Sequence, residues 1–503
     1  MAWHYLLAPP FIFLFFIFMY KNHFFYPLRK RIKSAIPSSL PVVGMLPVLV
    51  ANLNRMLDLS SRKLRGSNGN HFFFHGPWFL GMSIFVTANP VDARHLFIDN
   101  FQNYPKGKDF YEIFELGGDG IFIADGDTWK YHRVKAQLLM SSTNFRVFIA
   151  QLSREKIKNA LHPFLVHASS QNIVIDIQDM FLRLSFDMST NFIAGVDLGT
   201  LSKDLSENPI ARAIDEVAAA LFFRFVMPQP WWKLLRALGV GHEKRMAAGG
   251  RILDHFIANV IEERRREIIE GRDAPPSMLR SYMEETEVQE SYKFLRETVI
   301  NFLFAARDTT SAAMTWFLWA MCRYPHVEEK IMDELNSISK SITSDGLAVF
   351  EAEQLEKLIY FHASILESLR LHPSTPLNIR SVLKPDTLPT GVKLTPGMKV
   401  VASMYAMGRM KTIWGEDCLE FKPERWISKE GELKYEPSYK FLPFHTGPRS
   451  CLGKQIALTQ IKMVIAAMVY NFCFEIAEGH VPEPKFSFIL HMKKGLMVRV
   501  KKR

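Results

Sequence analysis

The chain contains few cysteines for its length. Four occur among 503 residues, at Cys322, Cys418, Cys451 and Cys473. No two of them have the short spacing typical of a zinc site, and they do not form the pattern of a disulfide-rich secreted protein. They fit a reducing compartment, and three are interpreted as small buried hydrophobic residues. Cys451 is the exception, because of its neighbours.

Internal repeats and long low-complexity linkers are also lacking. Although 503 residues could form roughly two to four domains, a single large domain is possible, because 48% of the residues are hydrophobic. The net charge of +11 suits a membrane surface or an acidic protein partner. Basic residues alternate with acids, as in residues 262–267, so we expect no nucleic-acid partner.

The first 20 residues contain no lysine or arginine. A signal peptide would carry positive charge there and would end at a cleavage site of small residues. Instead, an apolar run close to the ~20 residues of a membrane-spanning helix is followed by Lys21 and by basic residues at 29–33. We expect a transmembrane anchor over 1–20, a basic and proline-rich connector over 21–47 and a cytosolic domain over 48–503.

Helical periodicity dominates the rest of the chain. Apolar residues recur at helical spacing over 252–269 and 359–371, and short β-branched runs near 82–87 and 486–500 predict strands. The charged residues 270–289, which include two prolines, predict a loop. The fold class is therefore mainly α with small β-sheets.

The strongest motif is a loop that contains Cys451. It reads Phe444-His445-Thr446-Gly447-Pro448-Arg449-Ser450-Cys451-Leu452-Gly453. Its glycines permit close approach or a positive φ. A helix-forming stretch follows, and a helix N-terminus favours a thiolate, which is a good metal ligand. Arg449 is suited to pair with a carboxylate.

Other polar residues stand at helical spacing or inside an apolar helix. Residues 301–323 predict a buried helix with Ala305-Ala306-Arg307-Asp308-Thr309-Thr310 in its middle. Buried polar groups need a partner or a task, and a threonine can also bond back to its own helix.

Glu367 and Arg370 share a helix face, as an ordinary surface pair would. Trp129 and Arg133 are suitable donors to carboxylates.

Together these motifs resemble the cytochrome P450 family over essentially the whole chain. The resemblance implies the P450 fold, with the domain 48–503 as a haem-thiolate catalytic domain. The loop F-x-x-G-x-R-x-C-x-G implies that Cys451 binds the iron of haem b, with Phe444 and Arg449 in the same site. Trp129, Arg133 and Arg380 would contact the haem propionates.

The resemblance also gives roles to the charged residues. The family has an oxygen-binding sequence, A-G-x-D-T. Its acid corresponds to Asp308, which would feed protons inward, and its threonine corresponds to Thr309, whose hydroxyl would bind dioxygen. Ala306 replaces the usual glycine, and its methyl group would crowd the space above the iron. Glu367, Arg370 and the Arg425 of Pro423-Glu424-Arg425-Trp426 would form a buried charge cluster.

Residues 119–126, with the loop and helix motifs, are similar to the plant branch of fatty-acid ω-hydroxylases and mid-chain alkane hydroxylases. Most members have Asn-Ala where this chain has His445-Thr446. We expect hydroxylation of a lipophilic alkane or fatty-acid chain, with electrons from NADPH–cytochrome P450 reductase, at the endoplasmic reticulum membrane and in contact with its lipid. Basic residues Arg449, Lys454 and Lys462 predict an electropositive docking face.

Three alternatives stay open. Alkaloid-oxidising relatives in the same branch allow oxidative phenol coupling. A haem protein without turnover is a second class, although it would not need the Asp308–Thr309 pair. A P450-fold isomerase or dehydratase is a third, but such enzymes often lack that pair and usually lack an anchor.

Overall fold

The computed structural model describes residues 43–77, 82–272, 276–284, 291–343 and 346–503. The expected anchor and almost all of the connector lie outside these ranges. Within the described ranges, we find no helix with the length and apolar character needed to cross a membrane.

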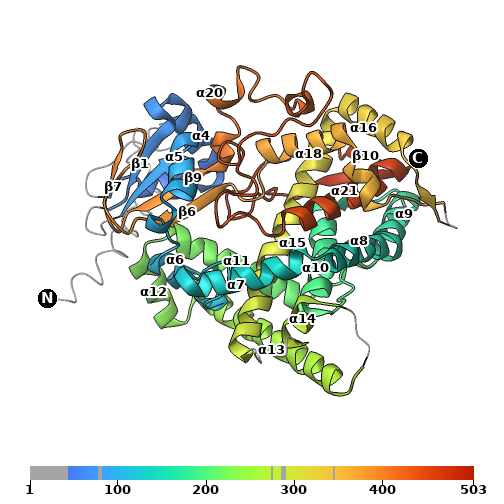
Figure 1. The fold of residues 1–503 in the computed structure, drawn as a ribbon, viewed down its shortest axis with the longest axis horizontal. Helices are drawn as coiled ribbons and strands as arrows, with labels where there is room; N and C mark the ends of the chain where they lie inside the picture. Colours follow the sequence, from blue (N-terminus) through green and yellow to red (C-terminus); the bar gives the residue numbers. More distant parts are fainter. Residues whose placement is uncertain (1–42, 78–81, 273–275, 285–290, 344–345) are drawn as a thin grey trace.

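Helices make up most of the described chain (Figure 1). Their bounds are α3 Leu46–Ala51, α4 Met56–Gly66, α5 Pro90–Arg94, α6 Lys108–Ile113, α7 Gly126–Ser141, α8 Thr143–Lys156, α9 His162–Ser170, α10 Ile177–Ala194, α11 Pro209–Val226, α12 Gln229–Leu238, α13 Gly241–Ile269, α14 Met278–Glu284, α15 Tyr292–Arg323, α16 Pro325–Ser337, α17 Ala352–Glu356, α18 Ile359–Leu371, α19 Met404–Met407, α20 Lys411–Trp414 and α21 Lys454–Asn471.

The strands form small sheets. The largest has the order β1 His71–His75, β2 Ser83–Thr87, β9 Lys399–Ser403 and β6 Leu377–Ser381. A second has the order β10 Phe472–Ile476, β11 Met497–Lys502 and β3 Val174–Asp176. The two-stranded sheets pair β4 Ser341–Ile342 with β5 Ala348–Val349 and β7 Asp386–Thr387 with β8 Lys393–Leu394. The predicted class, mainly α with small sheets, is confirmed.

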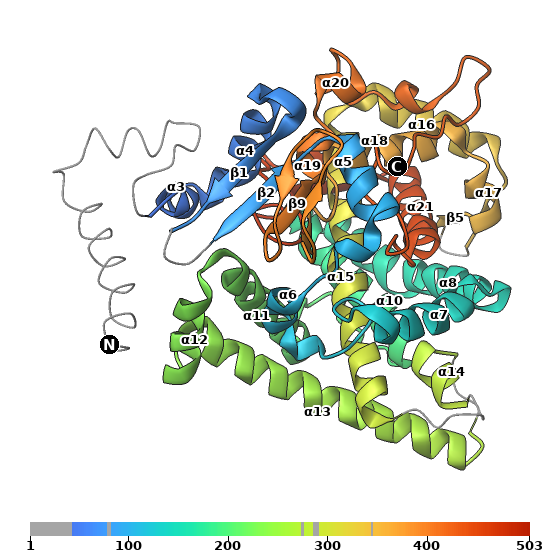
Figure 2. The same ribbon diagram turned by 60° about the vertical axis from the view of Figure 1, so that its left-hand side comes forward.

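The central element is α15, which runs through the helical part of the molecule (Figures 1 and 2). The Ser291 hydroxyl caps it by accepting from the Phe294 amide, so the helix begins before the predicted residue 301. Its first half packs in one apolar cluster with α13 and α14, and its second half packs in another with α18 and α21. Its polar turn, near Arg307 to Ser311, lies between these two clusters.

Two local predictions were wrong. The stretch 270–289 is not all loop, because α14 lies within it and buries Met278, Leu279 and Tyr282 on one face. The last strand begins only at Met497, since the preceding residues make isolated bridges. The predicted helix 252–269 lies inside α13, and 359–371 matches α18.

Candidate functional site

The Cys451 loop has a strained but well-anchored backbone. His445 has a φ of 58° and Gly447 a φ of 72°. Histidine is among the non-glycine residues that tolerate this region, so the backbone accepts His445 here. A Cβ atom at Gly447 would collide with the Phe97 carbonyl. The Cys451 amide donates to the Phe444 carbonyl at 2.8 Å.

The thiol of Cys451 lies before α21, whose first residue is Lys454. Cys451 is exposed in the described chain, yet the protein atoms packed around the thiol desolvate it enough to raise its pKa. The Gly453 amide together with Arg133 and Lys454 lowers this pKa only in part. The expected helix-terminus effect therefore does not by itself produce a thiolate. A coordinated metal cation deprotonates a thiol outright, so a bound iron would supply what the protein alone does not.

Three buried cations gather beside the loop with one acid among them. Burial lowers the pKa of Arg380 to about 9, and it lowers the pKa of Lys106, with Arg380 and Arg449 adding repulsion. Asp125 accepts from Arg449 Nη2 at 2.7 Å. Arg380 Nε and Arg449 Nε are buried and have no hydrogen-bond partner in the described chain. Buried charge needs opposite charge, so this set fits the two carboxylates of a haem.

Lys106 and Asp125 were missed by the sequence reasoning. The Asp125 carboxylate accepts from the amides of Lys106 at 3.0 Å and Gly107 at 2.9 Å, and so ties this segment to Arg449. No local pattern marks Lys106, because its charged neighbours Arg380 and Arg449 lie far along the sequence. For Asp125, the sequence offered one indication: aspartate is a residue type that often precedes a helix, and Asp125 stands directly before α7.

Trp129 and Arg133 both face the loop from α7. Trp129 is buried, and the Arg449 guanidinium lies 4.7 Å from the centre of its ring. Arg133 Nη1 donates to the Ser450 carbonyl at 2.6 Å. Residues four apart share a helix face, which is why one helix brings both to the loop. Trp129, Arg133, Arg380, Phe444 and Arg449 thus surround or belong to the segment that carries Cys451.

The middle of α15 supplies an acid and a hydroxyl. Thr309 Oγ1 donates to the Ala305 carbonyl at 2.7 Å, the back-bond that the sequence allowed. Ala305 is exposed and Thr309 is half-buried, although most of α15 is buried. Asp308 is 7% exposed, and its Oδ1 lies 3.3 Å from Arg307 Nη1 without a hydrogen bond. Leu452 and Ala306 pack against the same apolar cluster, so the Cys451 loop and this turn border one interior.

The expected charge cluster is assembled and buried. Glu367 and Arg370 are both 0% exposed and make two bonds of 2.7 Å to each other. Arg425 Nε lies 3.5 Å from Glu367 Oε1. Trp426, which sequence reasoning did not assign, donates to Glu367 Oε2 at 2.9 Å. The cluster therefore fastens α18 to the segment that carries Arg425 and Trp426.

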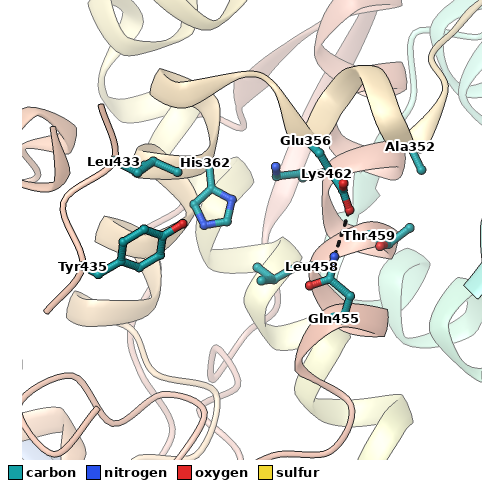
Figure 3. Close-up of a pocket in the computed structure, with 9 residues that line it drawn as sticks. All are labelled: Ala352, Glu356, His362, Leu433, Tyr435, Gln455, Leu458, Thr459 and Lys462. Atoms are coloured by element: carbon teal, nitrogen blue, oxygen red, sulfur yellow. Dashed lines mark hydrogen bonds between the residues drawn. The ribbon is translucent and has the colours of Figure 1, made fainter. Parts of the chain in front are cut away.

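A separate pocket of about 240 Å³ lies between α17, α18 and α21 (Figure 3). Lys462 lines it and donates to the Leu355 carbonyl at 3.0 Å, and burial lowers the pKa of Lys462 to about 8.

The expectation of a basic face from Arg449, Lys454 and Lys462 was wrong for two residues. The side chains of Arg449 and Lys462 are buried, and only Lys454 is exposed.

Comparisons with known proteins find relatives over nearly the whole chain. A family model described as cytochrome P450 matches residues 35–500. Noroxomaritidine synthase from Narcissus aff. pseudonarcissus MK-2014 is 40% identical over 481 residues, 94% of this chain and 93% of that protein. Alkane hydroxylase MAH1 from Arabidopsis thaliana is 37% identical over 501 residues, 98% of each chain. Cytochrome P450 86B1 from Arabidopsis thaliana is 39% identical over 487 residues, 94% of this chain and 87% of that protein.

Proposed function

The chain belongs to the cytochrome P450 family, and from this membership we propose that it is a monooxygenase whose iron is bound by Cys451. The family uses haem b held by a cysteine thiolate, and its members are oxidoreductases that act on lipophilic substrates. The observation that carries the assignment is the placement of Cys451 before α21, beside buried arginines whose Nε atoms have no hydrogen-bond partner in the described chain.

Each residue of the site has a separate task in this proposal. Arg380 and Arg449, whose Nε atoms have no partner in the described chain, would hold the haem carboxylates, and Trp129 and Arg133 support the loop. Asp308 Oδ1 and Thr309 Oγ1 hold and move protons on α15. Bound haem would supply dioxygen activation, because a thiolate ligand promotes cleavage of the O–O bond. The protein contributes orientation, protons and exclusion of water.

For the substrate, we propose an alkane or fatty-acid chain. The support is an apolar aromatic cluster that borders the same interior as Ala306. Phe488 lies 5.2 Å from Phe114, 5.5 Å from Phe222 and 5.3 Å from Phe225, measured between ring centres. Such a cluster would take the apolar surface of a hydrocarbon substrate out of water without offering it hydrogen bonds.

Oxidative coupling of phenol rings is the second candidate. The same aromatic rings can pack edge-to-face against a phenolic substrate. In addition, noroxomaritidine synthase is 40% identical to this chain, slightly more than the 37% of alkane hydroxylase MAH1.

Isotope labelling separates these candidates. The chain would be expressed with a plant NADPH–cytochrome P450 reductase and given a long-chain alkane, a fatty acid or a phenolic amine under labelled dioxygen. An alcohol that carries the label supports hydroxylation. A coupled product without the label supports the second candidate. NADPH oxidation that none of the three substrates stimulates would contradict both.

We further propose that residues 1–20 anchor the enzyme in the endoplasmic reticulum membrane, with the catalytic domain in the cytosol. The apolar run and the basic residues after it support this. Deletion of residues 1–20 should release much of the protein from membranes while the reduced carbon monoxide spectrum is retained. Some binding should persist through apolar surface. Full-length protein that is entirely soluble, or glycosylated in the lumen, would contradict the anchor.

A further inference from the structure

A second set of polar groups lies behind the Asp308–Thr309 turn. Arg307 is 4% exposed, and its Nη1 contacts Asp215 Oδ1 of α11 at 2.6 Å. Burial opposes the charge of Arg307, but Asp308 and Asp215 outweigh it and raise the pKa of Arg307. Arg307 Nε and Asp308 Oδ1 nevertheless have no hydrogen-bond partner in the described chain. Buried polar atoms without partners are uncommon and call for a task.

The C-terminal segment is linked to α15 directly through Trp316 and to the Thr309 turn indirectly through Ser374. Ser374 Oγ donates to the Thr309 carbonyl at 2.7 Å, and the Leu490 amide donates to the Ser374 carbonyl at 2.8 Å. Trp316 Nε1, further along α15, donates to the Leu490 carbonyl at 2.6 Å. The residue that follows, His491, is thereby fixed beside α15.

His491 brings a further unpartnered atom to the same place. Its Nδ1 is buried and has no hydrogen-bond partner in the described chain. The charged groups that face His491 are Asp308 and Arg307 on α15, Asp215 on α11 and Lys485 in its own segment. Among the described residues, neither His491 Nδ1 nor Asp308 Oδ1 has a hydrogen-bond partner, so proton exchange between these two atoms requires intervening water.

The electrostatics leave the imidazole neutral near pH 7. Burial lowers the pKa of His491, and Asp308 reverses this only in part. A neutral imidazole has one N–H and one free lone pair, so it can accept a proton and pass it on. The Asp215 side chain is 59% exposed, so the set reaches solvent on the α11 side.

We propose that His491 is a proton-holding residue that recharges Asp308 through one water molecule. A proton bound at His491 Nδ1 passes to the water, which gives one of its protons to Asp308 Oδ1. The imidazole is then neutral again and takes its next proton from solvent. This proposal rests on the monooxygenase function above, because it gives Asp308 the source of the protons that it delivers to the hydroxyl of Thr309.

The test uses the full-length enzyme loaded with haem and the variants His491→Gln and His491→Asn. Both remove the titrating group while keeping a polar side chain, so one can replace the other if it folds poorly. His480→Gln is the matched control, because His480 lies in the same C-terminal segment and contacts the Gly495 carbonyl instead. The first readout needs no turnover: the carbon monoxide stretching frequency of the reduced protein, measured from about pH 8 down to about pH 4, because the pKa of His491 is lowered from the usual ~6.5.

The wild-type enzyme and His480→Gln should show a pH-dependent shift in this frequency, because a nearby proton donor changes its charge. The His491 variants should lose the shift. Product formed per NADPH should fall about tenfold in these variants, less than the ~10²–10⁴ that direct general acid–base catalysis contributes, because His491 acts on the reaction only through Asp308. A shift that persists in both His491 variants, or is missing in the wild type, overturns the proposal. Loss of the thiolate-type carbon monoxide band in the wild type would instead refute the assigned function.

Discussion

At the scale of single residues, the geometry of Thr309 fits two roles: a hydroxyl that only bonds its own helix, and a hydroxyl that acts in proton transfer. Its hydroxyl donates to the Ala305 carbonyl, as in an ordinary helix, yet the oxygen keeps lone pairs that can accept. Thr315 makes the same bond, to the Ser311 carbonyl at 2.8 Å, but is fully buried. The half-buried position of Thr309 is what distinguishes the two, since it borders the interior that Ala305 and Ala306 also meet.

Thr309→Ala should therefore uncouple the reaction while the fold persists. NADPH should still be consumed, hydrogen peroxide should rise, and product should fall by about 10²-fold or more, since a proton-transfer group contributes ~10²–10⁴. Thr315→Ala is the control, because it removes an equivalent helix bond away from the site, and its coupling should match the wild type. The measurement is product formed per NADPH oxidised. Equal coupling in all three proteins would leave Thr309 with a structural role only.

Sequence reasoning at this scale succeeded where a residue sits in a local motif and failed where partners are distant. Trp129 and Arg133 lie together because one helix turn brings them together. Lys106 was missed because its electrostatic neighbours come from β6 and the Cys451 loop, which no local spacing reveals. The prediction that Lys462 is exposed was wrong for another reason. Its ammonium group donates to the Leu355 carbonyl inside the protein, and the sequence reveals the charge of a lysine but not its burial.

At the scale of elements, the Glu367–Arg370 pair joins α18 to the segment after α20, which includes a 3-10 helix over Pro423–Trp426. Arg370 also donates to the carbonyls of Cys418 at 2.7 Å and Glu420 at 2.9 Å. The E-x-x-R and P-E-R-W motifs allowed the cluster to be anticipated. The short α14 was not, because its buried face is only two turns long and its neighbours are charged.

Removal of one member of this cluster should be costly. Glu367→Gln leaves the Arg370 charge buried without its counter-ion, which should lower the free energy of unfolding by about 3–5 kcal/mol. Arg212→Gln is the control, since its side chain is 67% exposed and surface pairs are worth ~0–1 kcal/mol. Denaturant titration of the haem-loaded proteins measures both. Similar stabilities for the two variants would show that the cluster is not needed to hold α18.

At the scale of the whole molecule, buried histidines set an acid limit to stability. Burial, reinforced by Lys462 and Lys454, lowers the pKa of His362 to about 4. Burial lowers the pKa of His445 to about 3, with Lys106 and Arg380 adding to the effect. In the unfolded chain such residues titrate near pH ~6.5. Below this pH the unfolded state binds more protons than the folded state, so the free energy of unfolding falls as the pH decreases.

The unfolding midpoint in urea should therefore fall as the pH decreases from about 6.5 to about 4. His362→Gln removes one of these groups and should make the decline shallower. His255→Gln replaces an exposed histidine on α13 and should follow the wild-type curve. If His362→Gln and the wild type decline in parallel, the buried imidazole of His362 does not contribute to the acid sensitivity.

The central claim is that Cys451 alone binds the haem iron, and the reduced carbon monoxide difference spectrum tests it most directly. Cys473→Ser makes the same change at a half-buried position in β10 and serves as the control. We predict that the wild type and Cys473→Ser show the red-shifted band of a thiolate-bound haem and that Cys451→Ser does not. A Cys451→Ser protein that keeps this band would contradict the account.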